Sequence, residues 1–494
     1  MFGRDVPIVI EVYGTYLTIT SETWGEVRRG IYITKVLDKL KTSVFDFRKK
    51  KWHITDRFYM YDRDNYCFRL PRNALSVITE TLDNQLAKYE IKYMDPIKSD
   101  PIKFKIHKKF EARDYQETVI EHLLKNAPIA CTDMATGSGK TLLSLFTISK
   151  LQLRTLIICD GLTDQWKKVF TSSTSLKDDE NDIFIIKGAG SLRKLYKKKY
   201  KPKIFISSID TLRNYIKYDK LVYGDLPTYE EFLEEFGIGI KFIDEFHLNF
   251  KAIKMIDLVS NCKYNFYLSA TPKRSLKDAN RIFKIMFPDD IIFGKKITAE
   301  RYTNVTMYSY NLITNSDKKF TTVHGYAHTK YELMILNNNN FRRYYFENII
   351  KSVIDQYYIN KFDNGKLLIL MSTVAMCDAF KEFLSTVYQK DIRTYVSDDP
   401  EENLDEADII VSTPGSCGVG RDIANLVCCI NTISVNSAPL VEQILGRLRK
   451  LKDGRTPEFV DIFNRWVIRH QEHARNRARI YRTRALNYEE IEAQ

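Results

Sequence analysis

The stretch ATGSGKT, residues 135–141, decides the fold that we expect for this chain. It separates the apolar residues Ala127–Ala130 from the apolar, helix-like residues Leu142–Leu151, so a strand, a loop and a helix follow one another. Glycines in such a loop let backbone N–H groups turn toward phosphates at the start of a helix. Lys140 adds positive charge there, and the Thr141 hydroxyl is suited to Mg²⁺. The stretch therefore predicts a phosphate-binding loop for a nucleoside triphosphate.

The residues expected to hold the phosphates lie in this loop and at its carboxyl end. They are Thr136, Gly137, Ser138, Gly139, Lys140 and Thr141. Met134 stands where the strict pattern has its first glycine, so only the later part of the pattern is met. The alternative is a chance glycine-rich turn, and a true loop of this kind would still leave many ATPase and GTPase families open.

An acidic pair follows another apolar stretch later in the chain. Asp244 and Glu245 come directly after Lys241-Phe-Ile243, where a buried parallel strand would end. Asp244 is suited to hold Mg²⁺, and Glu245 is suited to polarise water for attack on the terminal phosphate. The alternative is a solvated pair or a helix cap. With Lys140, the pair predicts a catalytic site for nucleotide hydrolysis.

Short apolar runs alternate with helix-like stretches in two consecutive regions, which is typical of buried parallel strands in α/β domains. The first region has runs such as Thr155–Cys159 and Ile204–Ile206, and the second has Lys366–Leu370 and Ile409–Val411. The first hundred residues instead carry short Val, Ile, Tyr and Phe alternations followed by one helix-like stretch. We expect an α/β protein with two tandem parallel-sheet lobes and a small N-terminal α+β domain.

Changes in composition along the chain indicate where the domain boundaries lie. Residues 95–101 hold two prolines among polar side chains, which indicates a linker. Residues 465–484 hold seven arginines and one glutamate, which indicates a basic helix with either a solvated face or phosphate contacts. The expected parts are a substrate-recognition domain at 1–100, a first lobe at 101–290, a second lobe at 291–465 and a basic C-terminal helix at 466–494.

The composition narrows the class of protein. Of 494 residues, 44% are apolar, which is ample for folded cores, and no apolar run reaches about 18 residues, so we expect no membrane span. Eight cysteines are scattered without a CxxC pair, which favours a reduced, cytoplasmic location. The net charge of +13 favours a polyanionic partner, although many basic proteins never bind nucleic acid.

The order of the motifs resembles that of a known family. Gly-Lys-Thr at 139–141, Asp-Glu-Phe-His at 244–247 and Ser-Ala-Thr at 269–271 closely resemble the superfamily 2 helicases of the DExH type. The likeness extends from Arg113 to about Asp461. It implies two RecA-like lobes that hydrolyse ATP with Mg²⁺ between them while they grip a nucleic-acid strand.

The resemblance assigns further ATP contacts. Arg113, Tyr115 and Gln116 look like the adenine-reading segment of the family, although an ordinary helix start is the alternative. In the second lobe, Gly420 and Asp422 resemble the motif that links strand contact to the nucleotide.

Gln443 and Arg447 match the QxxGR core of the final helicase motif, which implies that Arg447 reaches the γ-phosphate as an arginine finger. The alternative for Arg447 is a surface arginine on a helix. The family's second arginine is replaced here by Lys450, and Arg449 comes one place early, so the identity of a second finger stays open.

The nucleic-acid contacts that the resemblance implies are Gln165, Ser208, Thr211 and Thr413. Hydroxyls and backbone N–H groups suit this role because they bind phosphate without reading bases.

Aromatic spacing in residues 44–47, 58–62 and 68–71 looks like the small N-terminal domain of phage branch-migration helicases, with any small accessory domain as the alternative. This likeness implies a DNA motor, a T5-like phage protein among the candidates, that regresses forks and migrates Holliday junctions in replication, recombination and repair. Branched or single-stranded DNA would be its partner, replication or recombination proteins further candidates, and the host cytoplasm its location. The alternatives are an RNA helicase, a restriction-type DNA translocase, and a nonenzymatic DNA-binding or transcript-release scaffold.

Overall fold

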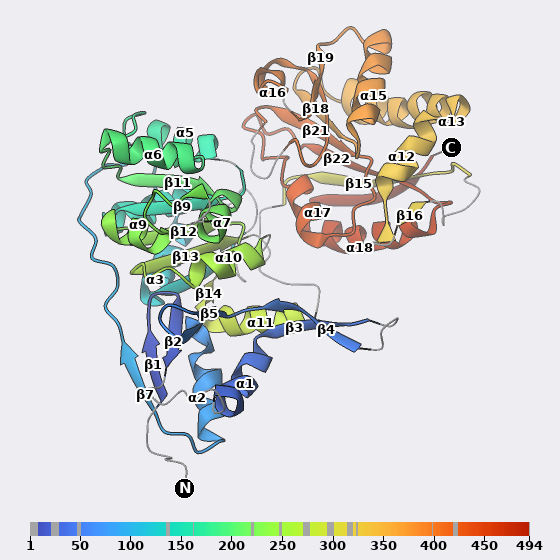
Figure 1. Ribbon diagram of the computed structural model, residues 1–494. Helices are drawn as coiled ribbons and strands as arrows, with labels where there is room; N and C mark the ends of the chain where they lie inside the picture. The colour runs from blue at the N-terminus through green and yellow to red at the C-terminus, as the bar shows by residue number, and fades with distance from the viewer. Residues whose placement is uncertain are drawn as a thin grey trace. The chain divides into compact units, whose positions relative to one another are not determined.

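The computed structural model divides into two compact units, Met1–Ile297 and Thr298–Gln494, which we describe separately (Figure 1). It describes residues 8–20, 29–46, 51–134, 139–161, 163–218, 222–246, 249–269, 277–293, 301–313, 320–322, 325–397, 399–417 and 423–493.

The first unit starts with a small α+β region, as the sequence predicts. Its elements are β1 (Ile8–Val12), β2 (Tyr16–Thr20), α1 (Arg29–Lys39), β3 (Lys41–Asp46), β4 (Lys51–Arg57), β5 (Met60–Asp62), β6 (Cys67–Pro71), α2 (Leu75–Asp83) and β7 (Tyr89–Tyr93). Five of the strands form a mixed sheet in the order β5-β6-β2-β1-β7, while β3 and β4 form a separate antiparallel pair. Alternate residues of β1 are buried, so one face of this sheet supplies a core.

The rest of the first unit is a parallel α/β lobe. Its strands are β8 (Ile129–Asp133), β9 (Thr155–Cys159), β10 (Ile183–Ile186), β11 (Ile204–Ser208), β12 (Ile240–Asp244), β13 (Tyr264–Ser269) and β14 (Ile292–Phe293). Its helices are α3 (Asp114–Lys125), α4 (Lys140–Leu151), α5 (Thr163–Ser173), α6 (Ala189–Lys198), α7 (Ile209–Lys217), α9 (Tyr229–Glu235), α10 (Phe250–Asp257) and α11 (Lys277–Met286). All strands run parallel in the order β10-β11-β9-β12-β13-β8-β14, which brings their carboxyl ends to one edge of the sheet.

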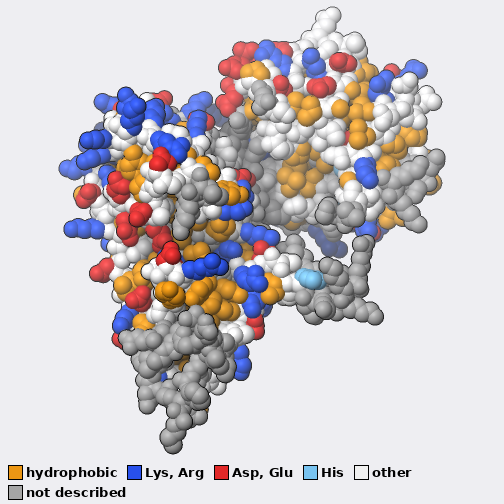
Figure 2. All heavy atoms as spheres, in the orientation of Figure 1, with side chains coloured by type: hydrophobic (Ala, Val, Ile, Leu, Met, Phe, Trp, Pro, Cys, Tyr) orange, Lys and Arg blue, Asp and Glu red, His pale blue; other side chains and the backbone are white. Residues whose placement is uncertain are grey.

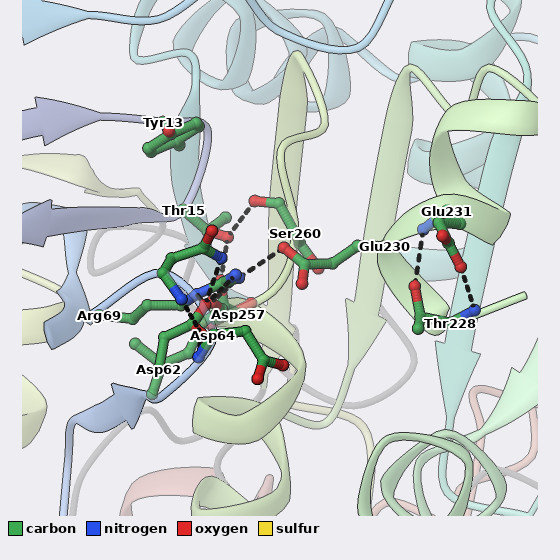
Figure 3. A network of polar contacts seen from close by, with 12 residues as sticks. Tyr13, Thr15, Asp62, Asp64, Arg69, Thr228, Glu230, Glu231, Asp257 and Ser260 are labelled. Carbon is green, nitrogen blue, oxygen red and sulfur yellow. Dashed lines mark hydrogen bonds and ion pairs between the residues drawn. The ribbon is translucent and has the colours of Figure 1, made fainter. Parts of the chain in front are cut away.

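Hydrogen bonds and an ion pair join the N-terminal region to this lobe, so the two are not connected by a free linker alone (Figure 3). The Thr15 hydroxyl donates to the carbonyl oxygens of Asp257 and Ser260 at 2.6 and 2.8 Å. Arg69 pairs with Asp62 of its own sheet at 2.7 Å and with Glu230 at the start of α9. Even the predicted linker takes part, because the N–H of the buried Ile97 donates to the Asn261 carbonyl at 3.0 Å.

The apolar cores agree with this attachment. Ile10 and Val12 of the N-terminal sheet belong to the same buried cluster as Phe250 and Ile256 of the lobe. A Cβ atom on Gly14 would lie 2.4 Å from the Cys262 carbonyl oxygen, so the two backbones meet where only glycine fits. The N-terminal region and the lobe therefore form one packed body.

The second unit is a second parallel α/β lobe. Its strands are β15 (Asn304–Tyr310), β18 (Lys366–Leu370), β19 (Ile392–Tyr395), β20 (Ile409–Ser412), β21 (Leu426–Asn431), β22 (Glu458–Asn464) and β23 (Asn487–Glu492), and a small pair is β16 (Thr321–Thr322) with β17 (Gly325–Tyr326). Its helical segments are α12 (His328–Leu336), α13 (Asn339–Arg343), η4 (Tyr344–Ile350), α14 (Lys351–Ile354), η5 (Asp355–Ile359), α15 (Val374–Val387), α16 (Glu402–Glu406), α17 (Ala438–Leu445) and α18 (Ile468–Arg484). The seven-stranded sheet has the order β19-β20-β18-β21-β22-β15-β23, again all parallel. The chain thus has two RecA-like lobes and a small N-terminal α+β region.

The tail contains the predicted basic helix, α18, and one strand more than the sequence predicts. After α18 the chain enters β23, which pairs with β15 and so becomes an edge strand of the second sheet. Arg477 of α18 is 1% exposed and is paired with Asp461 of β22. The tail is therefore an integral part of the second lobe.

Candidate active site

The described end of the phosphate-binding loop has the backbone that its glycines predict. Gly139 has a φ of +80° and immediately precedes α4. A Cβ atom there would lie 2.9 Å from Nε2 of Gln116, so both the left-handed backbone and the close contact require glycine. Thr136, Gly137 and Ser138 lie outside the described residues. Thr141 follows in the first turn of α4 and is half-buried.

The structure brings together two of the predicted catalytic residues. Lys140 starts α4, Glu245 follows β12, and their Nζ and Oε1 atoms are 2.5 Å apart. The two side chains are only 11% and 8% exposed. A cation at the start of the helix and an acid at the end of a strand thus meet at the carboxyl edge of the sheet.

Asp244 lies beside this pair and has an altered acidity. Burial, and then the charge of Glu245, raise the pKa of Asp244 to about 6, while Lys140 acts in the opposite direction. The Glu245 N–H donates to Oδ1 of Asp244 at 3.0 Å, and the Trp166 side chain hydrogen-bonds the same carboxyl group. Carboxylate and hydroxyl oxygens are suitable ligands for Mg²⁺, and the placing of Mg²⁺ at Asp244 and Thr141 stays a prediction.

Glu245 has a left-handed backbone, with a φ of +48°. A non-glycine residue in this conformation is uncommon, and such residues gather at functional sites.

Two residues near this site were missed by the sequence prediction. Trp166 is 3% exposed, and its side chain hydrogen-bonds the Asp244 carboxyl group. Asp160 follows β9, and burial, then Asp210 and Glu245, raise its pKa. Its place after a buried strand beside β12 was the available signal, because neighbouring parallel strands end at the same edge.

The expected adenine-reading residues lie at the start of α3. Gln116 is 2% exposed, its Oε1 accepts from the Arg113 N–H at 3.0 Å, and its Nε2 donates to the Gly139 carbonyl at 3.2 Å. The Arg113 guanidinium donates to the Tyr115 hydroxyl at 3.1 Å. Gln116 therefore ties the helix start to the phosphate-binding loop, and contact of these residues with adenine stays a prediction.

The expected strand contacts of the first lobe are separate from this cluster. Gln165 lies on α5, and Ser208 caps α7 by accepting from the Thr211 N–H at 3.1 Å. The Ser208 hydroxyl also donates to the Thr211 hydroxyl at 2.8 Å. The capping role alone explains these two residues, so their contact with nucleic acid stays a prediction.

The first lobe also has a basic surface. Figure 2 shows lysine and arginine side chains gathered over α5 and α6. Several are already matched with acids, as in the Arg193–Asp225 pair at 2.6 Å and the Lys194–Glu180 pair. This surface is therefore only partly available to a polyanion.

In the second lobe, Gln443 and Arg447 lie at the carboxyl end of α17 and line a cavity of about 50 Å³. Arg447 lies just after the end of α17 and is only 9% exposed. Gln443 Nε2 is buried and has no hydrogen-bond partner among the described residues. Cys417 lines the same cavity, and its N–H donates to the carbonyl of Thr413, which follows β20.

Other predicted residues of the second lobe are less constrained. The Thr413 hydroxyl hydrogen-bonds that of Ser416 at 2.9 Å. Lys450 is exposed, whereas Arg449 donates to the Gly446 carbonyl oxygen. Gly420 and Asp422 lie outside the described residues.

Comparisons with known proteins agree with the nucleotide site. Residues 109–274 match the family model described as "Type III restriction enzyme, res subunit". The chain is 25% identical over 344 residues to transcript termination protein A18 of Yaba-like disease virus, and the match spans 65% of each protein, a little under two thirds.

Two solved structures are similar. One is UvsW of phage T4, with 18% identity over 99% of this chain and 100% of that chain and a TM-score of 0.38. The other is the Hef helicase domain of Pyrococcus furiosus, with 12% identity over 74% of this chain and 98% of that chain and a TM-score of 0.45.

The family match covers the phosphate-binding loop and the acidic pair, and it supports an ATP-dependent helicase or translocase that acts on nucleic acid. The same match supports the use of ATP. Among the helices in the described part of the chain, none is both long and apolar enough to cross a membrane.

Proposed function

We propose that this protein is an ATP-dependent DNA motor of the DExH helicase type that remodels branched DNA. The observation that carries the motor is the Lys140–Glu245 pair beside Asp244 at the edge of the first sheet. Lys140 would bind the nucleotide phosphates, and Glu245 would orient and polarise the attacking water. Bound Mg²⁺, held by Thr141 and Asp244, would supply charge that stabilises the transferred phosphoryl group.

The second lobe would supply Arg447, whose charge would act on the γ-phosphate in the transition state. Closure on ATP and release after hydrolysis would then shift one lobe along the strand in each cycle. Phosphate contacts that ignore base identity suit such movement.

The N-terminal region would choose the substrate. It is packed onto the first lobe through Thr15, Arg69 and a shared apolar core, so a branch point held there would stay at a fixed position relative to that lobe. Its exposed aromatic residues include Tyr66 and Tyr93, each 68% exposed, and such rings are suited to stack on unpaired bases. Fork regression and branch migration in phage replication, recombination and repair fit this arrangement.

The main experiment compares ATP hydrolysis with single-stranded DNA, forked DNA, four-way junctions and RNA. We expect the largest stimulation by forks and junctions, together with strand exchange. Equal stimulation by RNA would favour an RNA helicase instead. Hydrolysis that ignores every nucleic acid would reject the motor.

Substitutions test the N-terminal role better than a deletion, because removing residues 1–100 would expose the core shared with the first lobe. Tyr66→Ala and Tyr93→Ala should lower the preference for junctions over linear duplex, while stimulation by single-stranded DNA stays unchanged. Unchanged junction preference in both variants would move branch recognition to the lobes.

The viral relative favours a second candidate function. Its name describes transcript termination, and the match includes 344 residues. A motor that moves along DNA could displace a transcript from a stalled complex with the same ATP site. Release of labelled RNA from a stalled elongation complex, dependent on ATP and lost in Glu245→Gln, would support this candidate over branch remodelling.

A further inference from the structure

A groove of about 640 Å³ lies in the second lobe between α18 and the sheet strands β15, β22 and β23. It is separate from the small cavity that Gln443 and Arg447 line, because the two share no lining residue. The placement of α18 beside the sheet is visible in Figure 1.

The groove has a basic wall. Arg475, Arg479 and Arg482 of α18 line it at helical spacing, and Arg465 lines it from the segment after β22. All four side chains belong to exposed residues. Successive guanidinium groups are therefore presented along one side of a hollow.

Two of these arginines are matched by acids and two are not. Arg482 pairs with Glu490 at 2.8 Å, and Arg465 pairs with Glu492. Arg475 and Arg479 form no ion pair or hydrogen bond with any other described residue. The groove thus carries two cations in excess of its own carboxylates.

The floor mixes apolar and polar side chains, and its helical wall is held in place. Met307 and Ser309 of β15 and Phe463 of β22 line the groove from the sheet, and so do Glu490 and Glu492 of β23. Arg477, on the opposite side of α18, is fixed by the buried Asp461 at 2.6 Å and by the Val435 carbonyl at 2.9 Å. The arginines that face the groove therefore stand on a firmly anchored helix.

We propose that this groove binds the phosphodiester backbone of a nucleic-acid strand. Guanidinium groups form bidentate hydrogen bonds with phosphate, and Met307 and Phe463 offer sugars and base edges an apolar contact that reads no sequence. A solvated arginine face on a convex helix would need no such hollow. The inference rests on the proposed function and adds a strand-binding site outside the predicted motifs.

The test uses the full chain and a labelled oligothymidine. In Arg475→Ala/Arg479→Ala, binding should weaken about tenfold at low salt, and the slope of log affinity against log salt should fall by about 1.4, at about 0.7 for each lost phosphate contact. Alanine preserves the helix, so the fold should persist. Hydrolysis of ATP without nucleic acid should not change.

Two variants serve as controls. Arg342→Ala/Arg343→Ala removes the same charge from exposed residues of α13 and should leave the salt slope close to that of the unchanged protein. Arg475→Lys/Arg479→Lys keeps both charges and should keep most of the salt slope.

An affinity and salt slope in the alanine pair equal to those of the α13 control would overturn the groove as a strand site. Binding of an acidic peptide is measured in parallel. If the alanine pair loses peptide binding but keeps oligothymidine binding, the strand site is overturned in favour of a protein partner. If the unchanged protein shows no nucleic-acid-stimulated hydrolysis, the proposed function fails. If stimulation is present but the groove variant behaves like its control, only the groove inference fails.

Discussion

Each unit contains an ion pair that is nearly closed to solvent, and the two pairs differ in how their acids are satisfied. In the first unit, Glu245 meets Lys140 through one short contact beside Asp244 at a strand end. In the second, both oxygens of Asp461 are bound by Arg477, and Oδ2 also accepts from the Tyr481 hydroxyl at 2.5 Å.

The Asp461 pair is saturated within its own lobe, so its purpose is to hold α18 against the sheet. The Lys140–Glu245 pair joins the start of α4 to an acid at the end of β12, and we propose that both groups act on a bound nucleotide. A buried ion pair can thus have a structural role or a catalytic one, and the substitutions below should separate the two pairs.

The largest effect is expected for Arg447→Ala. This arginine is 9% exposed, and we expect kcat to fall by about 10³ to 10⁵ because its charge would act mainly in the transition state. Single-turnover ATP hydrolysis, with ATP binding measured in parallel, checks this. Weakened binding at unchanged kcat would mark Arg447 as a ground-state contact.

Glu245→Gln should lower kcat by about 10² to 10⁴, because an amide cannot polarise the attacking water. Lys140→Ala should lower kcat by a similar factor, because it removes positive charge from the phosphates. Steady-state ATPase assays measure both effects, and circular dichroism provides the folding control. Near-normal turnover in either variant would remove the pair from the active site.

Arg477→Leu should lower the stability of the fold rather than act directly on ATP turnover. It leaves Asp461 buried without its cation, and we expect a loss of about 3–5 kcal/mol in the free energy of unfolding of the second unit. Urea denaturation gives the value, with Lys140→Ala as the comparison variant. The saturated pair would lose its structural interpretation if the two variants were equally stable.

The smallest expected effect is the pH dependence of ATP hydrolysis. Because the pKa of Asp244 is raised to about 6, this carboxyl group should take up a proton as the pH falls through 6 and lose the charge that binds Mg²⁺. We expect kcat/KM at limiting Mg²⁺ to fall about tenfold per unit below pH 6. The raised pKa also means that protonation removes an unfavourable buried charge, so this group should not make the fold less stable over that interval. A flat profile between pH 7 and 5 would contradict the assignment.

Much of the fold could be predicted, because buried parallel strands appear in the sequence as continuous apolar runs. The run Lys366–Leu370 coincides with β18, and Thr155–Cys159 coincides with β9. Strand β23 could not be predicted, because its sequence NYEEIE has neither a continuous nor an alternating apolar pattern and its conformation is set by pairing with β15.

Site residues that belong to local motifs could be predicted, whereas contacts between residues far apart in the sequence could not. Lys140 was predicted from its place before a helix and Glu245 from a strand end, but the hydrogen bond from Trp166 to Asp244 depends on tertiary packing. Arg477 looked like one more basic residue in the tail. Its burial had a faint signal, because Ala474, Ala478 and Tyr481 share its helical stripe and are also buried.

The place of β15 in the second sheet has a consequence for how the protein is made. This strand opens the second unit, yet both of its neighbours, β22 and β23, come from the far end of that unit. During synthesis, β15 has no neighbouring strand until residues 458–464 have left the ribosome and lacks its second neighbour until residues 487–492 follow, whereas the first unit can already be folded. The half that carries the predicted phosphate-binding loop can thus mature first, and the half that carries Arg447 keeps an unpaired strand while it waits.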